Sequence, residues 1–381
     1  MKFIHLSDTH LGYHQYGLSE RAKDYFDVFM SAVDKAIEYK VDFIIHTGDF
    51  FHHHRPSNET LLEGIEIVRR LKENNIPIFT IAGNHDRGSG VRDKSALEIL
   101  SHFGLKVLDG NVDDSLGVNI FGLKYISPIF IKRTLKIDEI FENLYEKASN
   151  KNNFNILMLH LEFEPFFQSG IDLEKTIQEG MFDYIGIGHY HQRQEPTKIK
   201  GSTVVYSGST EFTQFNEKAY VEKGCYLVEV EGKTCKTTFI PLTTRKFLSF
   251  SFDDNNIDQV LSDIKNLDFS SFDKKPILFL KGKSQEFLTR KDVFFKLEKE
   301  ELLDRFLYIN VDIVNQSKKV LDFQVIDNTE NFVTIKEKLR ELLDEEELIQ
   351  KLEGIIENLR AFQDLKEIEE FLNKNEDLLR I

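Results

Sequence analysis

The sequence has few of the features that mark secreted, membrane-spanning or nucleic-acid-coating proteins. Its only two cysteines, Cys225 and Cys235, have no metal-like spacing, so we expect no disulfide and a cytoplasmic location. No apolar run approaches the roughly 20 residues that cross a bilayer, and the strand pattern that Met1–Leu6 enters at once predicts no signal peptide. The net charge of −15 weakens any role in coating nucleic acid, although bound divalent cations would offset part of it.

The chain also lacks internal repeats and Gly/Ser linkers, so its domains must be found from patterning. With 381 residues, 41% of them hydrophobic, two or three domains are expected. In residues 1–244 apolar strands alternate with helices and later cluster in pairs, which predicts an α/β domain built on two sheets. Residues 245–328 predict a small α+β domain. Residues 329–381, rich in Leu, Glu, Lys and Ile, predict a tail of amphipathic helices.

Within the small domain the apolar runs predict strands at 247–252, 277–280 and 306–314. Helical spacing predicts helices at 258–267 and 294–303 between them.

Polar side chains follow five apolar strands of the first domain, at the point where each strand ends. The carboxyl ends of strands in α/β sheets are where ligands converge, so we expect these side chains to form one site. The glycine at 83 is expected to permit a sharp turn after its strand. The candidate ligands are Asp8, His10, Asp49, Asn84, His160, His189 and His191.

This set of ligands favours a particular chemistry. Imidazoles, carboxylates and one amide suit Mn²⁺, Fe²⁺ or Zn²⁺ better than Ca²⁺. Seven groups are too many for one ion, whereas a shared carboxylate would hold two ions about 3.5–4 Å apart. Two carboxylates and neutral imidazoles leave positive charge that a phosphate would balance. The sequence therefore predicts a two-metal site that hydrolyses phosphoesters.

The blocks also resemble a known superfamily. Asp8-x-His10, Gly48-Asp49, Gly83-Asn84-His85-Asp86, His160 and Gly188-His189-x-His191 resemble the five signature blocks of the calcineurin-like metallophosphoesterases. Asp8–Tyr13, Gly48–His52 with Arg55-Pro56-Ser57, and Tyr206–Ser209 resemble the SbcD and archaeal/eukaryotic double-strand-break repair nuclease branch (meiotic recombination eleven type). The resemblance covers about residues 1–245 well, the next domain loosely and the tail only in character. It implies a four-layer αββα sandwich with a DNA-binding cap domain and a helical tail.

The resemblance implies a role for each ligand. Asp8, His10 and His191 would hold a first Mn²⁺, Asn84, His160 and His189 a second, and Asp49 would bridge them; Mg²⁺ or another divalent ion is an alternative. His85 would face the scissile phosphate as general acid or electrostatic stabiliser, and His52 would lie near that phosphate. Asp86 is expected to cap the turn or orient a neighbour by hydrogen bonding.

The same resemblance implies substrates and partners. The expected activities are 3′→5′ exonuclease on duplex DNA ends and endonuclease on single strands or hairpins, in a nucleoid-associated protein. The tail would dock onto the coiled-coil base of an SbcC-like ABC-type ATPase. Candidate contacts for a homodimer, or alternatively for the core, are Leu61, Ile99 and Phe103. Candidate DNA contacts in loops beside the ligand blocks are Tyr13, His14, Gln15, Tyr16, Arg55, Arg87 and Arg92.

Two other functions compete with this prediction. A small-molecule phosphodiesterase or phosphoprotein phosphatase could use the same metal core, but such phosphatases usually carry Asp-Arg-Gly after the Gly-Asp block, where this chain has Phe50-Phe51-His52. A non-catalytic scaffold that tethers DNA ends should have lost a ligand, and none is missing. Among the other histidines, His5 and His46 lie within strand patterns and are expected to be packed.

Overall fold

The computed structural model describes residues 1–87, 95–127, 130–131, 136–164, 166–167, 170–214, 222–284 and 288–315. Backbone contacts divide the chain into one unit at Met1–Asn315 and a second at Gln316–Ile381. The predicted tail at 329–381 and the end of the predicted small domain lie outside the described residues, so both boundaries stay predictions. No described helix is long and apolar enough to cross a membrane.

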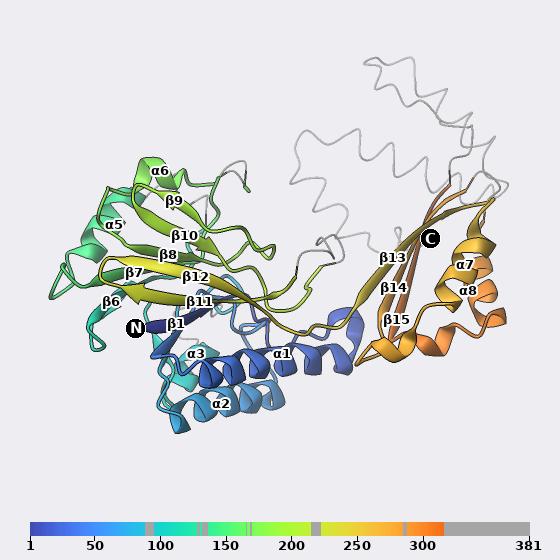
Figure 1. Ribbon diagram of the computed structural model, residues 1–381, viewed down its shortest axis with the longest axis horizontal. Coiled ribbons are helices and arrows are strands. Elements are labelled where there is room, and N and C mark those ends of the chain that lie inside the picture. Colours follow the sequence, from blue (N-terminus) through green and yellow to red (C-terminus); the bar gives the residue numbers. More distant parts are fainter. Residues whose placement is uncertain are drawn as a thin grey trace, which may run out of the picture. The chain divides into compact units, whose positions relative to one another are not determined.

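The first sheet has six strands in the order β12-β11-β1-β2-β3-β4 (Figure 1). The four strands β1 to β4 are parallel, whereas β11 and β12 run antiparallel along one edge. Parallel pairing places Leu6 beside His46, and His46 beside Thr80, so three neighbouring strands end together. Their bounds are β1 Lys2–Leu6, β2 Phe43–His46, β3 Ile78–Thr80, β4 Lys106–Val107, β11 Gly224–Glu231 and β12 Thr234–Pro241.

The second sheet also has six strands, in the order β5-β6-β7-β8-β10-β9. Its central strands β6, β7, β8 and β10 are parallel, and β5 and β9 pair antiparallel at the two edges. The central strands are buried along their whole length, as continuous apolar runs of parallel sheets are. The bounds are β5 Asn111–Asp113, β6 Val118–Leu123, β7 Phe154–Leu159, β8 Tyr184–Ile187, β9 Thr197–Ile199 and β10 Ser202–Tyr206.

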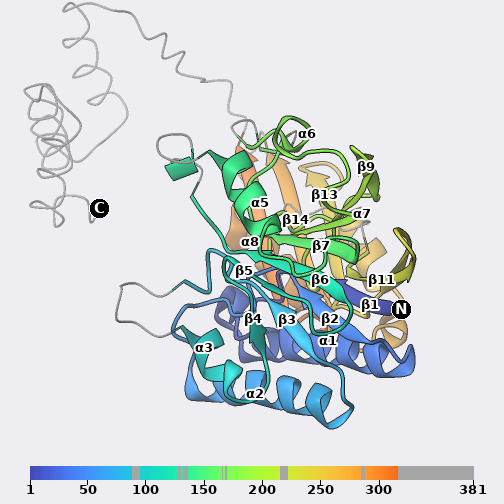
Figure 2. The same cartoon turned by 90° about the vertical axis from the view of Figure 1, so that its left-hand side faces the viewer.

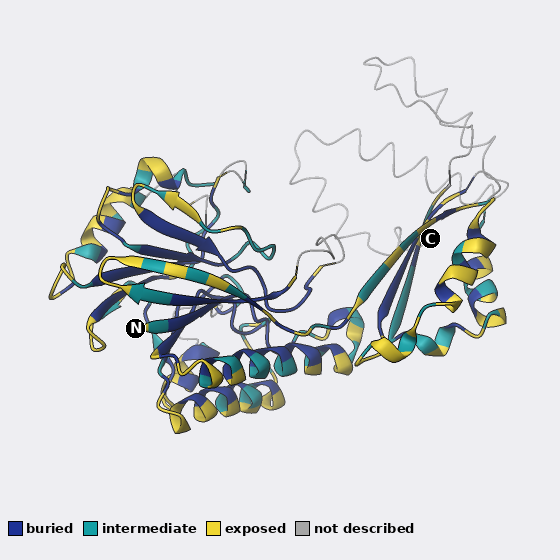
Figure 3. Cartoon of the chain, viewed as in Figure 1, coloured by how far each residue is buried: buried dark blue, intermediate teal, exposed yellow. Residues whose placement is uncertain are grey.

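Helices cover the outer faces of both sheets, which completes the four-layer αββα sandwich that the resemblance implied (Figure 2). One apolar core, including Phe3, Phe79 and Ile156, lies between the sheets. A second joins the first sheet to its helices, and a third joins the other sheet to its own. Figure 3 shows the resulting pattern of buried strands and half-exposed helices. The helices are α1 Ser19–Glu38, α2 Asn58–Glu73 and α3 Ala96–Ser101 on the first sheet, and α5 Ile137–Tyr145 and α6 Leu173–Thr176 on the second.

A small α/β region follows the sandwich. Its three strands, β13 Phe247–Asp253, β14 Ile277–Ser284 and β15 Tyr308–Asn315, form a parallel sheet in that order. Helices α7 Ile257–Lys265 and α8 Arg290–Lys299 pack on it around an apolar core that includes Leu261, Leu280 and Leu297. Strands and helices alternate along the chain and all three strands are parallel, so this region is α/β and its predicted α+β class was wrong.

Two predicted elements of this region had wrong bounds. The strand predicted to end at residue 280 continues to Ser284, because Lys281 and Lys283 are exposed while Gly282 and Ser284 are buried, the two-residue period of a strand. The helix predicted at 294–303 begins at Arg290, because Thr289 and Asp292 form a capping box that fixes its start.

Candidate metal centre

The seven predicted ligands come together where strands of the two sheets end. Asp8 and His10 follow β1, Asp49 follows β2, and Asn84 lies four residues beyond β3. His160 follows β7 directly, and His189 and His191 come soon after β8. Because these strands are parallel neighbours in their own sheets, their carboxyl ends bring all seven side chains to one place.

Four of the ligands form what we call the first half of the centre. Single donor atoms of Asp8, His10, Asp49 and His191 lie within 4.8 Å of one another. The Nε2 atoms of His10 and His191 are 3.2 Å apart. The Oδ1 atom of Asp8 is 3.7 Å from His191 Nε2, and the Oδ2 atom of Asp49 is 3.8 Å from His10 Nε2.

Asp49 also belongs to the second half of the centre, together with Asn84, His160 and His189. Its Oδ2 atom is 3.3 Å from His160 Nε2. The Oδ1 atom of Asn84 lies 3.1 Å from His160 Nε2 and 3.0 Å from His189 Nδ1. Nitrogen and oxygen lone pairs so close together repel unless a proton or a cation lies between them. Two divalent ions that share Asp49 therefore fit the residues present.

Four ligand residues have strained backbones. The φ angles of Asp8, His10, Asp49 and His189 are +51°, +44°, +55° and +82°. This left-handed region costs a non-glycine residue of order 1 kcal/mol or more and persists only where the surrounding structure imposes it. The strain marks the strand ends as a functional site independently of the ligand chemistry.

Two glycines beside the ligands lie so close to other atoms that a Cβ would not fit at either position. A Cβ on Gly83 would lie 2.1 Å from Asp49 Oδ1, and a Cβ on Gly188 would lie 2.2 Å from Ser7 Oγ and 2.3 Å from the Thr47 carbonyl. The chain bends at residues 84–86, directly after Gly83, but Gly83 does not have a positive φ, so the turn does not use the conformational freedom of glycine. The role of Gly83 is to let the backbone approach Asp49, a contact between distant segments that the local sequence does not show.

Hydrogen bonds outside the ligand set orient the ligand rings. His160 donates from Nδ1 to the Thr47 carbonyl at 2.7 Å, which leaves Nε2 as the ligand atom. The Nδ1 of His191 pairs in the same way with Thr213 Oγ1. The backbone N–H of His189 donates to both oxygens of the Asp8 carboxylate, at 3.2 and 3.1 Å. The two halves are thus linked through this peptide group as well as through Asp49.

Asp86 holds two loops together. Its carboxylate accepts hydrogen bonds from the backbone N–H groups of Phe50, Phe51 and Gly83, at 3.1, 2.9 and 3.0 Å. These bonds agree with the expectation that Asp86 caps a turn or orients a neighbour. Burial and then the nearby Asp49 charge raise the pKa of Asp86 to about 7 despite the three donors.

The protonation states of Asp49, His160 and His189 determine how a cation binds at the second half. Burial alone would raise the pKa of Asp49, but the imidazoles of His160 and His10 hold it well below its usual range. Burial would lower the pKa of His160, yet the Asp49 carboxylate raises it to about 9. A dication at His160 Nε2 would displace that proton, so binding there should strengthen as the pH rises. Burial and the nearby His160 lower the pKa of His189 to about 3, which keeps this ring neutral.

Two predicted catalytic histidines lie beside the first half. Donor atoms of His10, His52 and His85 lie within 4.8 Å of one another. His85 donates from Nδ1 to the His52 carbonyl at 2.7 Å, and its backbone N–H donates to Asp49 Oδ1 at 2.9 Å. The His52 ring stacks on Tyr13, with centroids 3.7 Å apart. Both residues are therefore fixed by contacts with the ligand loops.

The structure divides the predicted DNA contacts into two groups. His14, Arg55 and Arg87 are exposed, and Arg87 lies over the Tyr125 ring at 5.8 Å. Arg92 lies outside the described residues. Gln15 is buried and Tyr16 is half-buried, each in contact with other parts of the chain.

Gln15 is 1% exposed, donates to the Thr213 carbonyl at 2.9 Å and accepts from Arg21. Tyr16 stacks on Tyr308 of the small domain at 4.3 Å. A single 3₁₀ turn at Gln15–Gly17 (η1) folds this loop inward, through contacts with segments far away in the sequence.

The candidate dimer residues differ in exposure. Ile99 and Phe103 are 38% and 41% exposed, whereas Leu61 is half-buried against the core of the first sheet and its helices. The adjacent Leu62 is 65% exposed. The outward apolar side chain of α2 is therefore Leu62.

Sequence reasoning missed several residues around the ligands. Glu162 Oε1 lies 3.6 Å from His189 Nε2, on the side of the ring opposite its ligand atom. Lys223 donates to the His191 carbonyl at 2.8 Å and to Ser209 Oγ at 2.7 Å. Ser209 belongs to the Tyr206–Ser209 block that carried the family resemblance, so that block was a signal that could have located this support.

Comparison with known proteins agrees with the fold and identifies the family. The family model of the calcineurin-like phosphoesterases matches residues 1–193. The DNA double-strand break repair protein Mre11 of Methanococcus maripaludis is 33% identical over 299 residues, which is 73% of this chain and 77% of that protein. The Mre11 of Methanocaldococcus jannaschii is 30% identical over 84% of this chain and 86% of its own length. The Mre11 of Archaeoglobus fulgidus is 27% identical over 91% and 83%.

Proposed function

The chain belongs to the calcineurin-like phosphoesterases and, within them, to the family of the Mre11 repair proteins, and on this premise we propose that it is a manganese-dependent DNA nuclease. It would degrade duplex ends as a 3′→5′ exonuclease and cut single strands and hairpins as an endonuclease, in the cytoplasm at the nucleoid. The observation that carries the proposal is the convergence of seven ligand groups on one shared carboxylate, Asp49, with His85 beside it.

The chain's residues would perform distinct tasks in this reaction. When bound, the two ions would supply Lewis-acid activation of water and phosphate. The Asp49 carboxylate, which accepts a hydrogen bond from the His85 backbone N–H, would be the ligand that both ions share. Because His85 donates from Nδ1 to the His52 carbonyl, Nε2 is left to face the scissile phosphate. When the ring carries a proton on both nitrogens, Nε2 would pass its proton to the leaving 3′ oxygen. His52, stacked on Tyr13, would contact the same phosphate.

The substitution His85→Gln tests this proposal. We expect wild type to cleave linear duplex and hairpin DNA with Mn²⁺, and His85→Gln to lose about 10²–10⁴ in rate while still binding two ions. His102→Gln, at the exposed end of α3, is the matched control and should cleave as wild type does.

The same substrate panel separates the competing functions. Cleavage of small phosphodiesters or phosphoproteins without DNA cleavage would replace the nuclease with the first alternative. Wild-type protein that binds two ions and cuts no substrate would favour the end-tethering scaffold.

We further propose that DNA is held through its backbone by Tyr13, His14, Arg55 and Arg87, by Arg92, which lies outside the described residues, and by the small domain as a cap. Since the chain is acidic, this binding should be weak and sensitive to salt. Tight binding by the isolated chain at high salt would contradict this part of the proposal.

A homodimer is proposed through the exposed apolar side chains of α2 and of the α3 region, Leu62, Ile99 and Phe103. Sedimentation of Leu62→Asp should show a monomer, whereas Leu61→Asp should chiefly destabilise the core. A Leu62→Asp protein that stays dimeric would refute this surface.

Residues 329–381 are proposed to bind the ATPase partner. Truncation after residue 328 should abolish co-purification with an SbcC-like ATPase and leave DNA cleavage intact. Retained co-purification would assign the interface to another part of the chain.

A further inference from the structure

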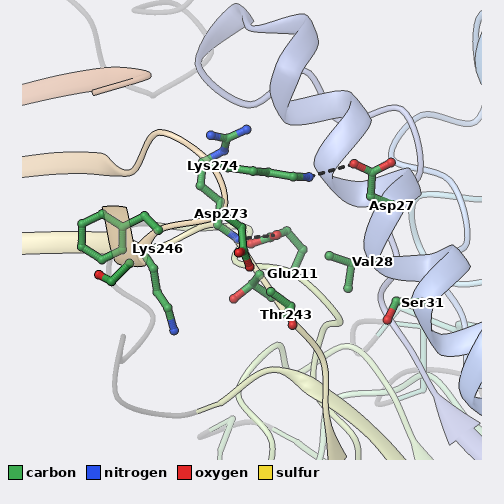
Figure 4. Close-up of a pocket in the computed structure, with 12 residues that line it drawn as sticks. Asp27, Val28, Ser31, Glu211, Thr243, Lys246, Asp273 and Lys274 are labelled. Carbon is green, nitrogen blue, oxygen red and sulfur yellow. Dashed lines mark hydrogen bonds and ion pairs between the residues drawn. The ribbon is translucent and has the colours of Figure 1, made fainter. Parts of the chain in front are cut away.

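Charged side chains cluster where α1 of the sandwich meets the small domain: Arg21, Asp24, Glu211 and Arg245 are buried, whereas Asp27 is half-buried and Lys274 is exposed. The set contains three cations and three carboxylates, drawn from α1, from the loop after β10 and from the small domain. A cavity of about 270 Å³ lies beside them, and Figure 4 shows Lys274 reaching across it to Asp27 of α1. The six side chains are Arg21, Asp24, Asp27, Glu211, Arg245 and Lys274.

Asp24 is the centre of this ionic cluster. Its carboxylate accepts from Arg21 Nη1 at 2.6 Å, from Arg245 Nε and Nη2 at 2.5 and 2.9 Å, and from Lys274 Nζ at 2.9 Å. Asp24 is 1% exposed. Arg245 and Lys274 come from the small domain, whereas Arg21 lies on the same helix as Asp24. One buried carboxylate therefore joins the two domains.

Arg21 carries the connection to the loop at 211–213. Its Nη2 atom donates to the Phe212 carbonyl at 3.1 Å and lies 3.4 Å from Glu211 Oε1. Its Nε donates to Gln15 Oε1, and Gln15 donates in turn to the Thr213 carbonyl at 2.9 Å. Arg21 of α1, directly and through Gln15 of η1, therefore contacts all three residues of the loop.

The small domain also touches this loop directly. The ring of Phe212 packs on the ring of Phe247 in β13, with centroids 5.2 Å apart. The Arg21 guanidinium lies over the same Phe247 ring at 5.2 Å. A shift of β13 would therefore disturb the loop through apolar as well as ionic contacts.

The loop ends at a ligand of the metal centre. Thr213 Oγ1 pairs with His191 Nδ1. On the opposite edge of the ring, His191 Nε2 faces Asp8 and His10. Ser209, whose Oγ donates to the Glu211 carbonyl at 2.8 Å, also donates its backbone N–H to the His191 carbonyl at 3.0 Å. Both the ring and the backbone of His191 thus depend on this loop.

We propose that Asp24, Arg21 and Thr213 are positioning residues that couple docking of the small domain to the geometry of His191, and so to the affinity of the first metal position. We call this series of contacts, from the small domain through Asp24, Arg21 and Thr213 to His191, the relay. It rests on the proposed function, since it concerns the same metal centre. When the small domain is docked, the ionic cluster holds the loop and Thr213 holds the imidazole with Nε2 toward the ion. When docking weakens, His191 loses its orientation and the first ion is held less tightly, while the second position keeps its ligands.

The test is titration of the full-length protein with Mn²⁺, followed by the electron paramagnetic resonance signal of the free ion. Arg245→Met removes the small-domain end of the relay and Thr213→Val removes its last hydroxyl. Each should weaken one of two Mn²⁺ sites by about tenfold or more, the typical loss when a group that orients a ligand is removed. Thr213→Ser keeps the hydroxyl and should restore wild-type binding.

Asp34→Asn is the matched control, because Asp34 lies on the same helix and pairs with Arg70 at the exposed surface. It should bind both ions as wild type does. Asp24→Asn should resemble Arg245→Met if it folds; thermal unfolding decides whether it does, and the other two variants test the relay in either case.

Wild-type affinities for both ions in Arg245→Met would overturn the coupling to the small domain. Wild-type affinities in Thr213→Val would overturn the relay at its last step. Wild-type protein that binds two ions and cuts no DNA would instead refute the proposed function, and the binding results would still decide the relay.

Discussion

The two halves of the metal centre are supported in different ways. The second half relies on buried core elements, since His160 donates to the Thr47 carbonyl just beyond β2. The first half relies on a loop, since His191 is oriented by Thr213 and the loop in turn contacts the small domain. A rigid sandwich thus fixes one ion position, and the other depends on how a second domain is docked.

Replacing the shared ligand should have the largest effect. Asp49→Asn removes the negative charge common to both halves, so we expect loss of both Mn²⁺ ions and of all measurable hydrolysis. Asp8→Asn should lose only the first ion. Equilibrium dialysis with metal analysis distinguishes the two results, and one ion retained by Asp49→Asn would show that the halves are independent.

Gly188→Ala should damage the core-supported half. Its Cβ would meet Ser7 Oγ, the Thr47 carbonyl and, at 2.7 Å, His160 Nδ1. Overpacking at a buried site typically costs about 1–3 kcal/mol. We expect a lower melting temperature and a weaker second ion. Unchanged binding at the second position would contradict the account of how His160 is oriented.

Stability in the absence of metal should fall with acid because two buried histidines, His5 and His46, lie near the strand ends that carry the ligands. The ring of His5 contacts Thr47 Oγ1 at 3.0 Å, and the ring of His46 contacts Thr9 Oγ1 at 2.9 Å. Burial is the main cause that lowers both pKa values from 6.5 to about 3. Both were expected to be packed, and both are buried.

Below pH 6.5 these two histidines bind protons in the unfolded chain but stay neutral in the folded protein. Stability is therefore lost as the pH falls from about 6.5 toward about 3. Between pH 7 and pH 5 each histidine should cost about 2 kcal/mol of unfolding free energy. Urea unfolding with EDTA should show that His5→Gln reduces the acid loss by about that amount. An equal loss in variant and wild type would mean that His5 is charged when folded.

Glu162→Gln should have the smallest effect. Glu162 and His189 are 25% and 17% exposed in their side chains, and their closest atoms are 3.6 Å apart. A partly solvated pair of this kind contributes little, so we expect the second ion to weaken a few-fold with the first unchanged. A change of a hundredfold would instead make Glu162 a principal support of that half.

Local patterns predicted much of this molecule, because the chemistry lies at strand ends. Apolar runs ending in Asp8, Asp49 and His160 were enough to place those side chains together once the strands were taken as parallel. Patterns could not show that Gln15 points inward, since its partners Arg21 and Thr213 come from another helix and a distant loop. The requirement for Gly83 was hidden for the same reason, because Asp49 creates it across the fold.

The left-handed backbone at Asp8, His10, Asp49 and His189 also has a consequence for substitution. Glycine adopts such angles without strain, so the backbone itself would accept glycine at positions where metal binding requires a side chain. The four ligands are therefore held at a cost in conformational energy that the rest of the fold offsets.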